Sequence, residues 1–99
     1  MGMWIGALEF DLLLGDVHSL KEKRSLVRPL VAEIKRKYGV SVAEVEHLDL
    51  HRRAGIGVAV VAPDQRHLVE LLDTVERRVA YHPEVELLSV HRSVRTSDD

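Results

Sequence analysis

The stretch Ser19-Leu20-Lys21-Glu22-Lys23-Arg24 marks the point where a strand-like run ends and a helix begins. Ser19 and Glu22 have the spacing of a capping box, in which each side chain bonds the other residue's free backbone N–H. Upstream, residues 3–14 place apolar side chains at every second position, the pattern of a half-buried strand. The chain is therefore expected to open with a strand that leads directly into a helix.

The helix is expected over residues 20–38. Its apolar residues recur on one side at the helical period, and Gly39 follows as a suitable C-terminal cap. Pro29 lies inside this segment, on the face opposite the apolar stripe. Because proline removes one backbone hydrogen bond, it predicts either a bend near Ser25 or a break into two helices.

The remainder predicts two strands, a second helix and a last strand. Asp64 is a good N-cap for that helix, and Pro83 ends it because the residue before a proline avoids helical angles. The first of the two strands changes its alternation phase, which predicts a β-bulge. The three strands are expected at residues 40–47, 54–62 and 84–92.

The order of elements is β-α-β-β-α-β, which predicts a ferredoxin-like α+β sandwich. Its four-stranded antiparallel sheet would carry both helices on one face. With 99 residues and 45% apolar content, the chain is long enough for one modest core. We expect a single domain over residues 1–92 and a flexible polar tail over residues 93–99.

Three strings of sequence resemble the DUF503 family of small bacterial proteins, also called YlxP-like. They are Ile5-Gly6-Ala7-Leu8-Glu9-Phe10, the Ser19–Arg24 stretch, and Val40-Ser41-Val42-Ala43-Glu44-Val45 with Glu46-His47. The resemblance implies a ferredoxin-like fold and a cytoplasmic bacterial setting. Genes of this family often lie among translation genes, which implies an RNA or ribosome connection. One departure is His51, where family members often carry a bulky residue, commonly Trp.

Charge is distributed unevenly along the chain. Residues 19–38 hold seven basic and two acidic residues, a net charge of +5, whereas the rest holds seven basic and fourteen acidic residues, −7. Four cations fall within about 60° on the helical wheel: Lys21, Arg24, Arg28 and Lys35. A row of cations can follow a phosphate backbone, so these residues are candidates for RNA or anion binding. The alternative is an ordinary solvated helix face.

Lys23 differs from these cations because its wheel position lies inside the apolar stripe. A buried ammonium needs a counter-charge, and Glu44 or Glu46 on the following strand could supply it. We expect a structural ion pair between Lys23 and Glu44. The alternative is a snorkelling lysine whose head reaches water.

The connection between the two middle strands holds the remaining polar candidates. His47, Asp49 and His51 would share one side of an extended strand, but three residues without supporting groups are an incomplete zinc site, and we expect no metal. Arg52 and Arg53 could extend the basic footprint. We identify no catalytic constellation, cofactor motif or small-molecule substrate, so we expect a protein that is not an enzyme.

The sheet face away from the helices is expected to be unusually apolar. Its candidate interface residues are Ile5, Ala7, Leu13, Ala59 and Val61. The alternatives are scattered surface aliphatics or a homodimer or partner surface. The chain lacks cysteine, a secretion signal and a long apolar run, so we expect a cytoplasmic location and no membrane contact.

Overall fold

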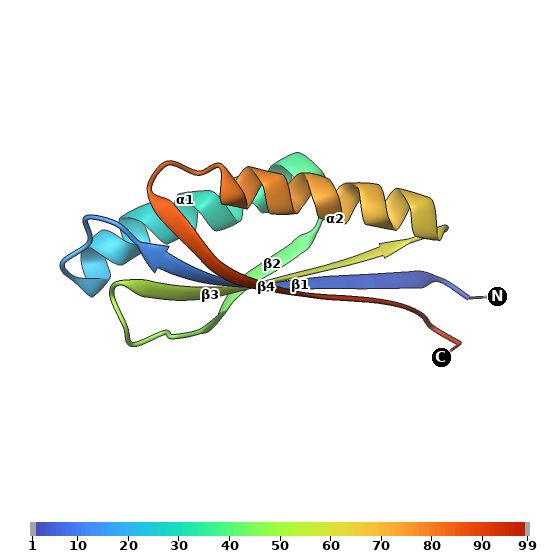
Figure 1. Ribbon diagram of the computed structural model, residues 1–99, viewed down its shortest axis with the longest axis horizontal. Coiled ribbons are helices and arrows are strands. Elements are labelled where there is room, and N and C mark those ends of the chain that lie inside the picture. The colour runs from blue at the N-terminus through green and yellow to red at the C-terminus, as the bar shows by residue number, and fades with distance from the viewer. Residues whose placement is uncertain (1, 99) are drawn as a thin grey trace.

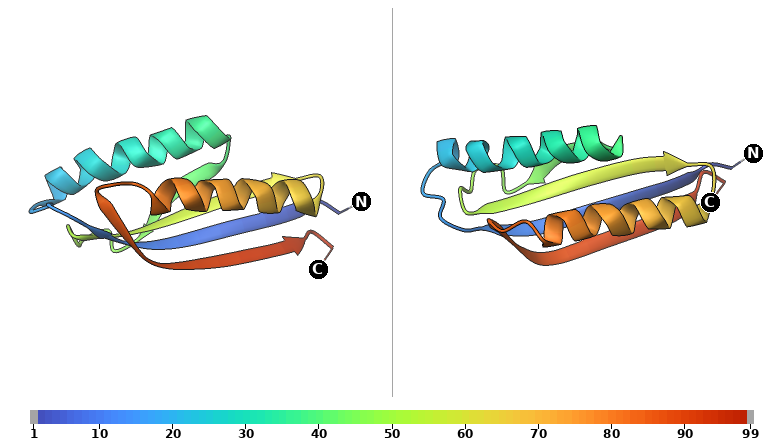
Figure 2. Two further views of the ribbon diagram at one scale, coloured as in Figure 1. Left: turned by 45° about the horizontal axis from the view of Figure 1, so that its top comes forward. Right: turned by 90° about the horizontal axis from the view of Figure 1, so that it is seen from above.

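The computed structural model describes residues 2–98 and has the expected ferredoxin-like order. The elements are β1 (Trp4–Leu14), α1 (Leu20–Tyr38), β2 (Ser41–Glu46), β3 (Arg53–Ala62), α2 (Gln65–Ala80) and β4 (Val85–Thr96). The strands form one antiparallel sheet in the order β2-β3-β1-β4. Both helices lie on one face of this sheet (Figure 1). Seen from above, α1 lies toward the β2 side and α2 toward β1 and β4 (Figure 2).

Both helices begin and end where local signals place them. Ser19 Oγ accepts a hydrogen bond from Glu22 N at 3.1 Å, and Asp64 Oδ1 accepts one from His67 N at 2.8 Å. Gly39 ends α1 with a φ of 64°, a left-handed conformation that glycine adopts without strain. Helix α1 continues through Pro29 without a break, because the proline ring lies on the exposed side. The predicted alternative of two separate helices is therefore wrong.

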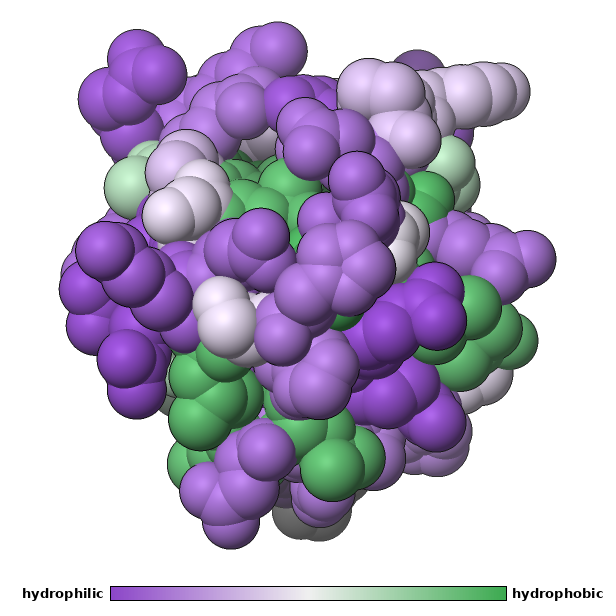
Figure 3. Space-filling view, turned by 90° about the vertical axis from the view of Figure 1, so that its left-hand side faces the viewer, coloured by the Kyte–Doolittle hydropathy of each residue, from purple (hydrophilic) through white to green (hydrophobic). Residues whose placement is uncertain are grey.

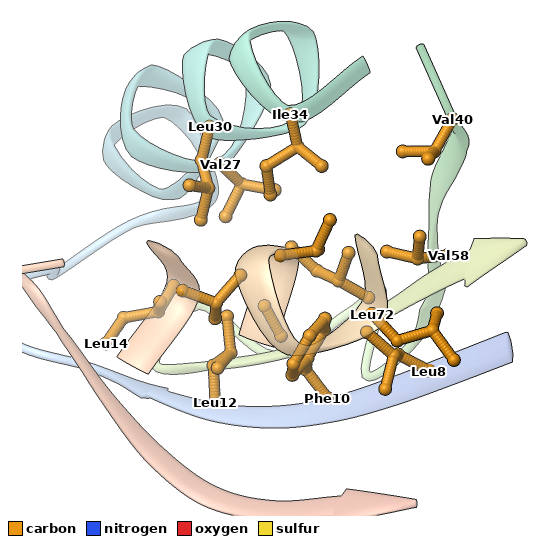
Figure 4. Packing of buried hydrophobic residues seen from close by; sticks show 14 of the residues in the cluster. Leu8, Phe10, Leu12, Leu14, Val27, Leu30, Ile34, Val40, Val58 and Leu72 are labelled. Atoms are coloured by element: carbon orange, nitrogen blue, oxygen red, sulfur yellow. The ribbon is translucent and has the colours of Figure 1, made fainter. Parts of the chain in front are cut away.

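The core fills the space between the sheet and the two helices. Alternate residues of β1 point toward the helices, among them Leu8, Phe10 and Leu12, each at most 2% exposed (Figure 4). They meet Leu30 and Ile34 of α1, and the inner stripe of α2 closes the other side. Leu20, which the helical period also assigns to the apolar stripe of α1, is 37% exposed at the start of the helix.

Two β-bulges shape the sheet. The predicted bulge in β2 lies between Glu44 and Glu46, near the end of the strand. A second bulge, which the sequence did not predict, interrupts the pairing of β4 with β1 next to Asp11 and Leu12. Each bulge shifts the register by one residue. In β4 this shift keeps both Leu87 and Val90 on the inner face, opposite Leu12 and Phe10.

The expected flexible tail is wrong for its first part. Strand β4 extends to Thr96, which pairs with Trp4, and Ser97 N donates to Met3 O at 2.9 Å. The reason is that Val94 continues the alternating pattern opposite Gly6, so pairing with β1 persists through the polar residues between them. Residues 93–96 therefore belong to the sheet, and Asp99 lies outside the described residues.

Candidate nucleic-acid interface

The basic surface of α1 is defined here as the side chains of Lys21, Arg24, Arg28 and Lys35. All four are exposed. The first three line one shallow hollow of about 390 Å³ together with Ser25 and Pro29. Lys35 lies two turns farther along and does not line it. The helix therefore gathers three of the four predicted cations around a single concave site.

The carboxylates of α1 are engaged away from this surface. Glu22 Oε2 accepts a hydrogen bond from His18 N at 2.7 Å, at the start of the helix. Glu33 is held by the Arg78 guanidinium of α2 in a two-bond contact, with both distances 2.7 Å. This contact lowers the pKa of Glu33, chiefly through the hydrogen bonds and secondarily through the charge of Arg78. Within residues 2–98, no ion pair neutralises the basic surface.

Helix N-termini generally favour anions, but the N-terminus of α1 is poorly suited to one. The Glu22 side chain bonds the backbone N–H of His18 there, one residue before the capping Ser19. A neighbouring hollow of about 270 Å³ is lined by Asp16, Glu22 and Glu84. Three carboxylates repel a phosphate, so the cationic site is confined to the helix side rather than its start.

The predicted ion pair of Lys23 is confirmed. Its side chain is 3% exposed, and Nζ lies 2.6 Å from Glu44 Oε2. Nζ also donates hydrogen bonds to the carbonyl oxygens of His47 and Leu50, each at 2.8 Å. The ammonium thus combines two hydrogen bonds to the loop backbone with a charge contact to the carboxylate. Lys23 therefore holds the turn that begins the β2–β3 loop (residues 47–52).

Arg53, which the sequence grouped with the basic footprint, is paired with a carboxylate on another face of the molecule. Its Nη2 lies 2.7 Å from Oδ1 and 2.6 Å from Oδ2 of Asp11, on the sheet face away from the helices. This guanidinium lowers the pKa of Asp11, first through hydrogen bonding, against a smaller opposing effect of burial. The sheet register causes the pairing, because Arg53 lies opposite Leu13, diagonal to Asp11.

Arg52 is also separated from the basic surface. Its Nε donates to Leu14 O at 3.3 Å, and it lines a hollow with Asp16, Glu84 and Glu86. An arginine among three carboxylates adds little positive potential for a polyanion. Neither Arg52 nor Arg53 lines the hollow on α1.

The histidines of the β2–β3 loop do not share one strand face, because β2 ends at Glu46. His47 has a φ of 59°, and its Nε2 lies 3.4 Å from Asp11 Oδ1 and 3.4 Å from Arg53 Nη2. Over the described residues, no three His, Asp or Glu side chains gather so that they could hold a metal. Figure 3 views this end of the molecule, where hydrophobic groups are exposed among hydrophilic ones.

The sheet face away from the helices is more mixed than the sequence predicts. Val61 is 61% exposed, and Ile5, Ala7 and Leu13 are half-buried. A hollow of about 440 Å³ lies on this face, and Gly55 is among the residues that line it. Its charged and polar lining includes Glu9, Asp11, Glu46, His47, Ser89 and His91.

Sequence reasoning missed the cluster of Asp11, His47 and Arg53 on this face. The three residues come from β1, the β2–β3 loop and β3, and no spacing in the sequence connects them. The available signal was the pair of outward-facing acidic residues, Glu9 and Asp11, in the mainly apolar strand β1.

The protein is an α+β sandwich of ferredoxin-like topology, and the cations on the outer side of α1 have no ion-pair partner among the described residues. The sequence profile of DUF503, described as a protein family of unknown function, matches residues 5–92. The chain therefore belongs to the DUF503 family, as the three strings of sequence suggested. It is 29% identical over 82 residues to the uncharacterized protein YlxP of Bacillus subtilis (strain 168), covering 83% of this chain and 89% of that protein.

Two solved structures resemble the fold more distantly. A Bacillus cereus chain described as a candidate antibiotic biosynthesis monooxygenase is 16% identical, with a TM-score of 0.47 and coverage of 98% of this chain and 94% of its own. LarC2, the C-terminal domain of a cyclometallase, is 12% identical, with a TM-score of 0.37 and coverage of 97% and 57%. Across residues 2–98, neither helix combines the length and apolar character needed to cross a membrane.

Proposed function

We propose that this chain is a non-enzymatic accessory factor that binds RNA, free or in a ribosomal particle, through the basic surface of α1. The observation that supports it is the contrast in ion pairing among the described residues. Arg53, Arg78 and Arg92 are paired with carboxylates of neighbouring elements. Lys21, Arg24, Arg28 and Lys35 are exposed and form no ion pair with any described carboxylate, and the first three share one hollow.

Uncompensated cations around a concave helix side suit a phosphate backbone. Their contacts would position the RNA without selecting its sequence. The three cations of the hollow, with Lys35 as a fourth, would release roughly three to four counterions on binding. For a single strand, the slope of log K against log salt concentration is then about −2 to −3.

The test is binding of a labelled ribosomal RNA fragment, followed by fluorescence anisotropy over a series of salt concentrations. The variant Arg24→Glu with Arg28→Glu is expected to abolish binding. The matched control is Arg36→Glu with Lys37→Glu, which makes the same charge change on the same helix outside the hollow. Equal losses in both variants, or binding that salt does not weaken, would refute a site at this surface.

The sheet face away from the helices supports a second candidate, a homodimerisation surface. Val61 is 61% exposed there, beside a hollow of about 300 Å³ lined by Ala7, Gly57 and Ala59. Small side chains allow close approach of a second copy. Sedimentation equilibrium of Val61→Glu tests this candidate: a wild-type dimer that the substitution leaves intact would argue against it.

A further inference from the structure

Strand β4 forms one edge of the sheet and is 12 residues long. Most strands in globular proteins span about 3–10 residues. An edge strand presents unpaired backbone N–H and C=O groups, and natural proteins protect such edges by shortness, charge or proline. Strand β4 contains no proline, and it bonds β1 on one side alone.

The opposite edge provides a contrast within the same sheet. Strand β2 is 6 residues long and its charged residues are both acidic, Glu44 and Glu46. A second β2 beside it would place like charges close together over a short run. Strand β4 is twice as long and carries charges of both signs, Glu86, Arg92 and Arg95, so the same repulsion between like charges does not apply along its edge.

We propose that β4 pairs antiparallel with β4 of a second copy of this chain, so that two four-stranded sheets become one continuous sheet. The sequence of β4 is complementary to itself when His91 lies opposite His91 of the other copy. In this register Val90 lies opposite Arg92, and Ser89 opposite Ser93. The two residues of each pair lie on the same sheet face, as antiparallel pairing requires. Val90 and Arg92 pair with Phe10 and Leu8 of β1 on one face, whereas Ser89 and Ser93 pair with Asp11 and Ala7 on the other.

Because of the bulge in β4, the residues on its N-terminal side also face complementary residues of the second copy. Leu88 is skipped in the pairing with β1. If Leu88 is also left unpaired between the two copies, Leu87 lies opposite Val94 of the second copy and Glu86 lies opposite its Arg95. Leu87 and Val94 pair with Leu12 and Gly6 on the helix side, whereas Glu86 and Arg95 pair with Leu13 and Ile5 on the other side.

The two-fold axis therefore generates two ion pairs, each between Glu86 of one copy and Arg95 of the other. Both residues are exposed, and neither forms an ion pair with another described residue of its own chain. Leu88, which is 46% exposed, lies beside this contact. A shifted register would lose the opposite-charge pairs and place alternate side chains on the wrong face.

The dimer leaves the basic surface of α1 free. Helix α1 packs against β2, at the sheet edge opposite β4 (Figure 2). Two basic surfaces would then lie on the outer flanks of one assembly. The inference does not depend on RNA binding, and a variant that abolishes one property is expected to leave the other measurable.

The test is a charge swap followed by sedimentation equilibrium. Arg95→Glu and Glu86→Arg each place like charges together twice and are expected to weaken the dimer about tenfold. The double variant Glu86→Arg with Arg95→Glu restores both pairs and is expected to return the dissociation constant to within about threefold of wild type. Circular dichroism checks that each variant is folded.

Arg36→Glu, the same charge change at an exposed residue of α1, is the matched control and is expected to leave this dimer intact. Val61→Glu separates this dimer from one formed through the sheet face. A wild-type chain that stays monomeric up to about 1 mM would overturn the inference. A dimer that Val61→Glu dissociates while the charge swap has no effect would also overturn it, and would support the sheet face instead. Failure of the double variant to restore association would exclude the proposed register.

Discussion

Replacing Lys23 tests whether a buried ammonium organises the β2–β3 loop. In Lys23→Met, the apolar stem is retained, but the ion pair with Glu44 and two hydrogen bonds to loop carbonyls are lost. Hydrogen bonds to a charged group contribute about 1.5–3 kcal/mol each. Because the loop carbonyls can regain water and methionine packs well, we expect a net loss of about 3–4 kcal/mol in the free energy of unfolding.

Glu44→Gln probes the other partner. Breaking a buried pair by removing one charge costs about 3–5 kcal/mol when the remaining charge is fully enclosed. The Glu44 side chain is 24% exposed, and Lys23 retains its two carbonyl contacts, so we expect about 2–3 kcal/mol. The double variant leaves no uncompensated charge and should be no less stable than Lys23→Met. The coupling energy is then about 2 kcal/mol.

Urea unfolding followed by circular dichroism measures all three variants, with Lys21→Met on the exposed side of α1 as the control. The control should change stability by less than about 0.5 kcal/mol. In thermal melts, each kcal/mol corresponds to about 4–8 °C in Tm for a domain of this size. Hydrogen exchange at Leu50, whose N–H donates to His47 O at 3.1 Å, should accelerate in Lys23→Met. The reasoning would be refuted if the losses in unfolding free energy of the two single variants added up in the double variant, or if hydrogen exchange at Leu50 did not change in Lys23→Met.

Two further predictions concern the bulge and acid stability. In Gly55→Ala, the new Cβ would overlap the Glu46 side chain and lie 3.1 Å from its Cα, so we expect a loss of about 1–3 kcal/mol in urea unfolding. Gly57→Ala meets the methyl groups of Val45 at 3.2 and 3.4 Å, and this half-exposed side chain has room to shift, so the change should cost less than about 1 kcal/mol; a loss equal to that of Gly55→Ala or larger would contradict this. Because Arg78 lowers the pKa of Glu33, the unfolded state takes up the proton first as pH falls below the ordinary value of 4.5. The stabilisation by Arg78 should therefore be fully present above that pH and lost as pH falls through the folded pKa. Urea midpoints of wild type and Arg78→Gln should accordingly differ above about pH 5 and converge at lower pH; a constant difference would count against the assignment.

Local signals in the sequence determined the elements and their order. Capping residues such as Ser19 and Asp64 act within one helical turn, and apolar periodicity sets the inner face of each element. The burial of Lys23 also followed from its wheel position, because a helix has a fixed angle per residue. These features depend on contacts between residues close in sequence, or on a regular repeat, and a sequence displays both directly.

Tertiary structure alone decided which charges are free. Arg53 was grouped with the basic helix, yet the register of β3 against β1 sets it on Asp11. The packing of α2 against α1 likewise directs Glu33 to Arg78 and so leaves the outer side of α1 uncompensated. Strand β4 extends through polar residues because β1 continues to offer it backbone partners. Such outcomes depend on pairing between distant segments, and no local spacing encodes the register that brings them together.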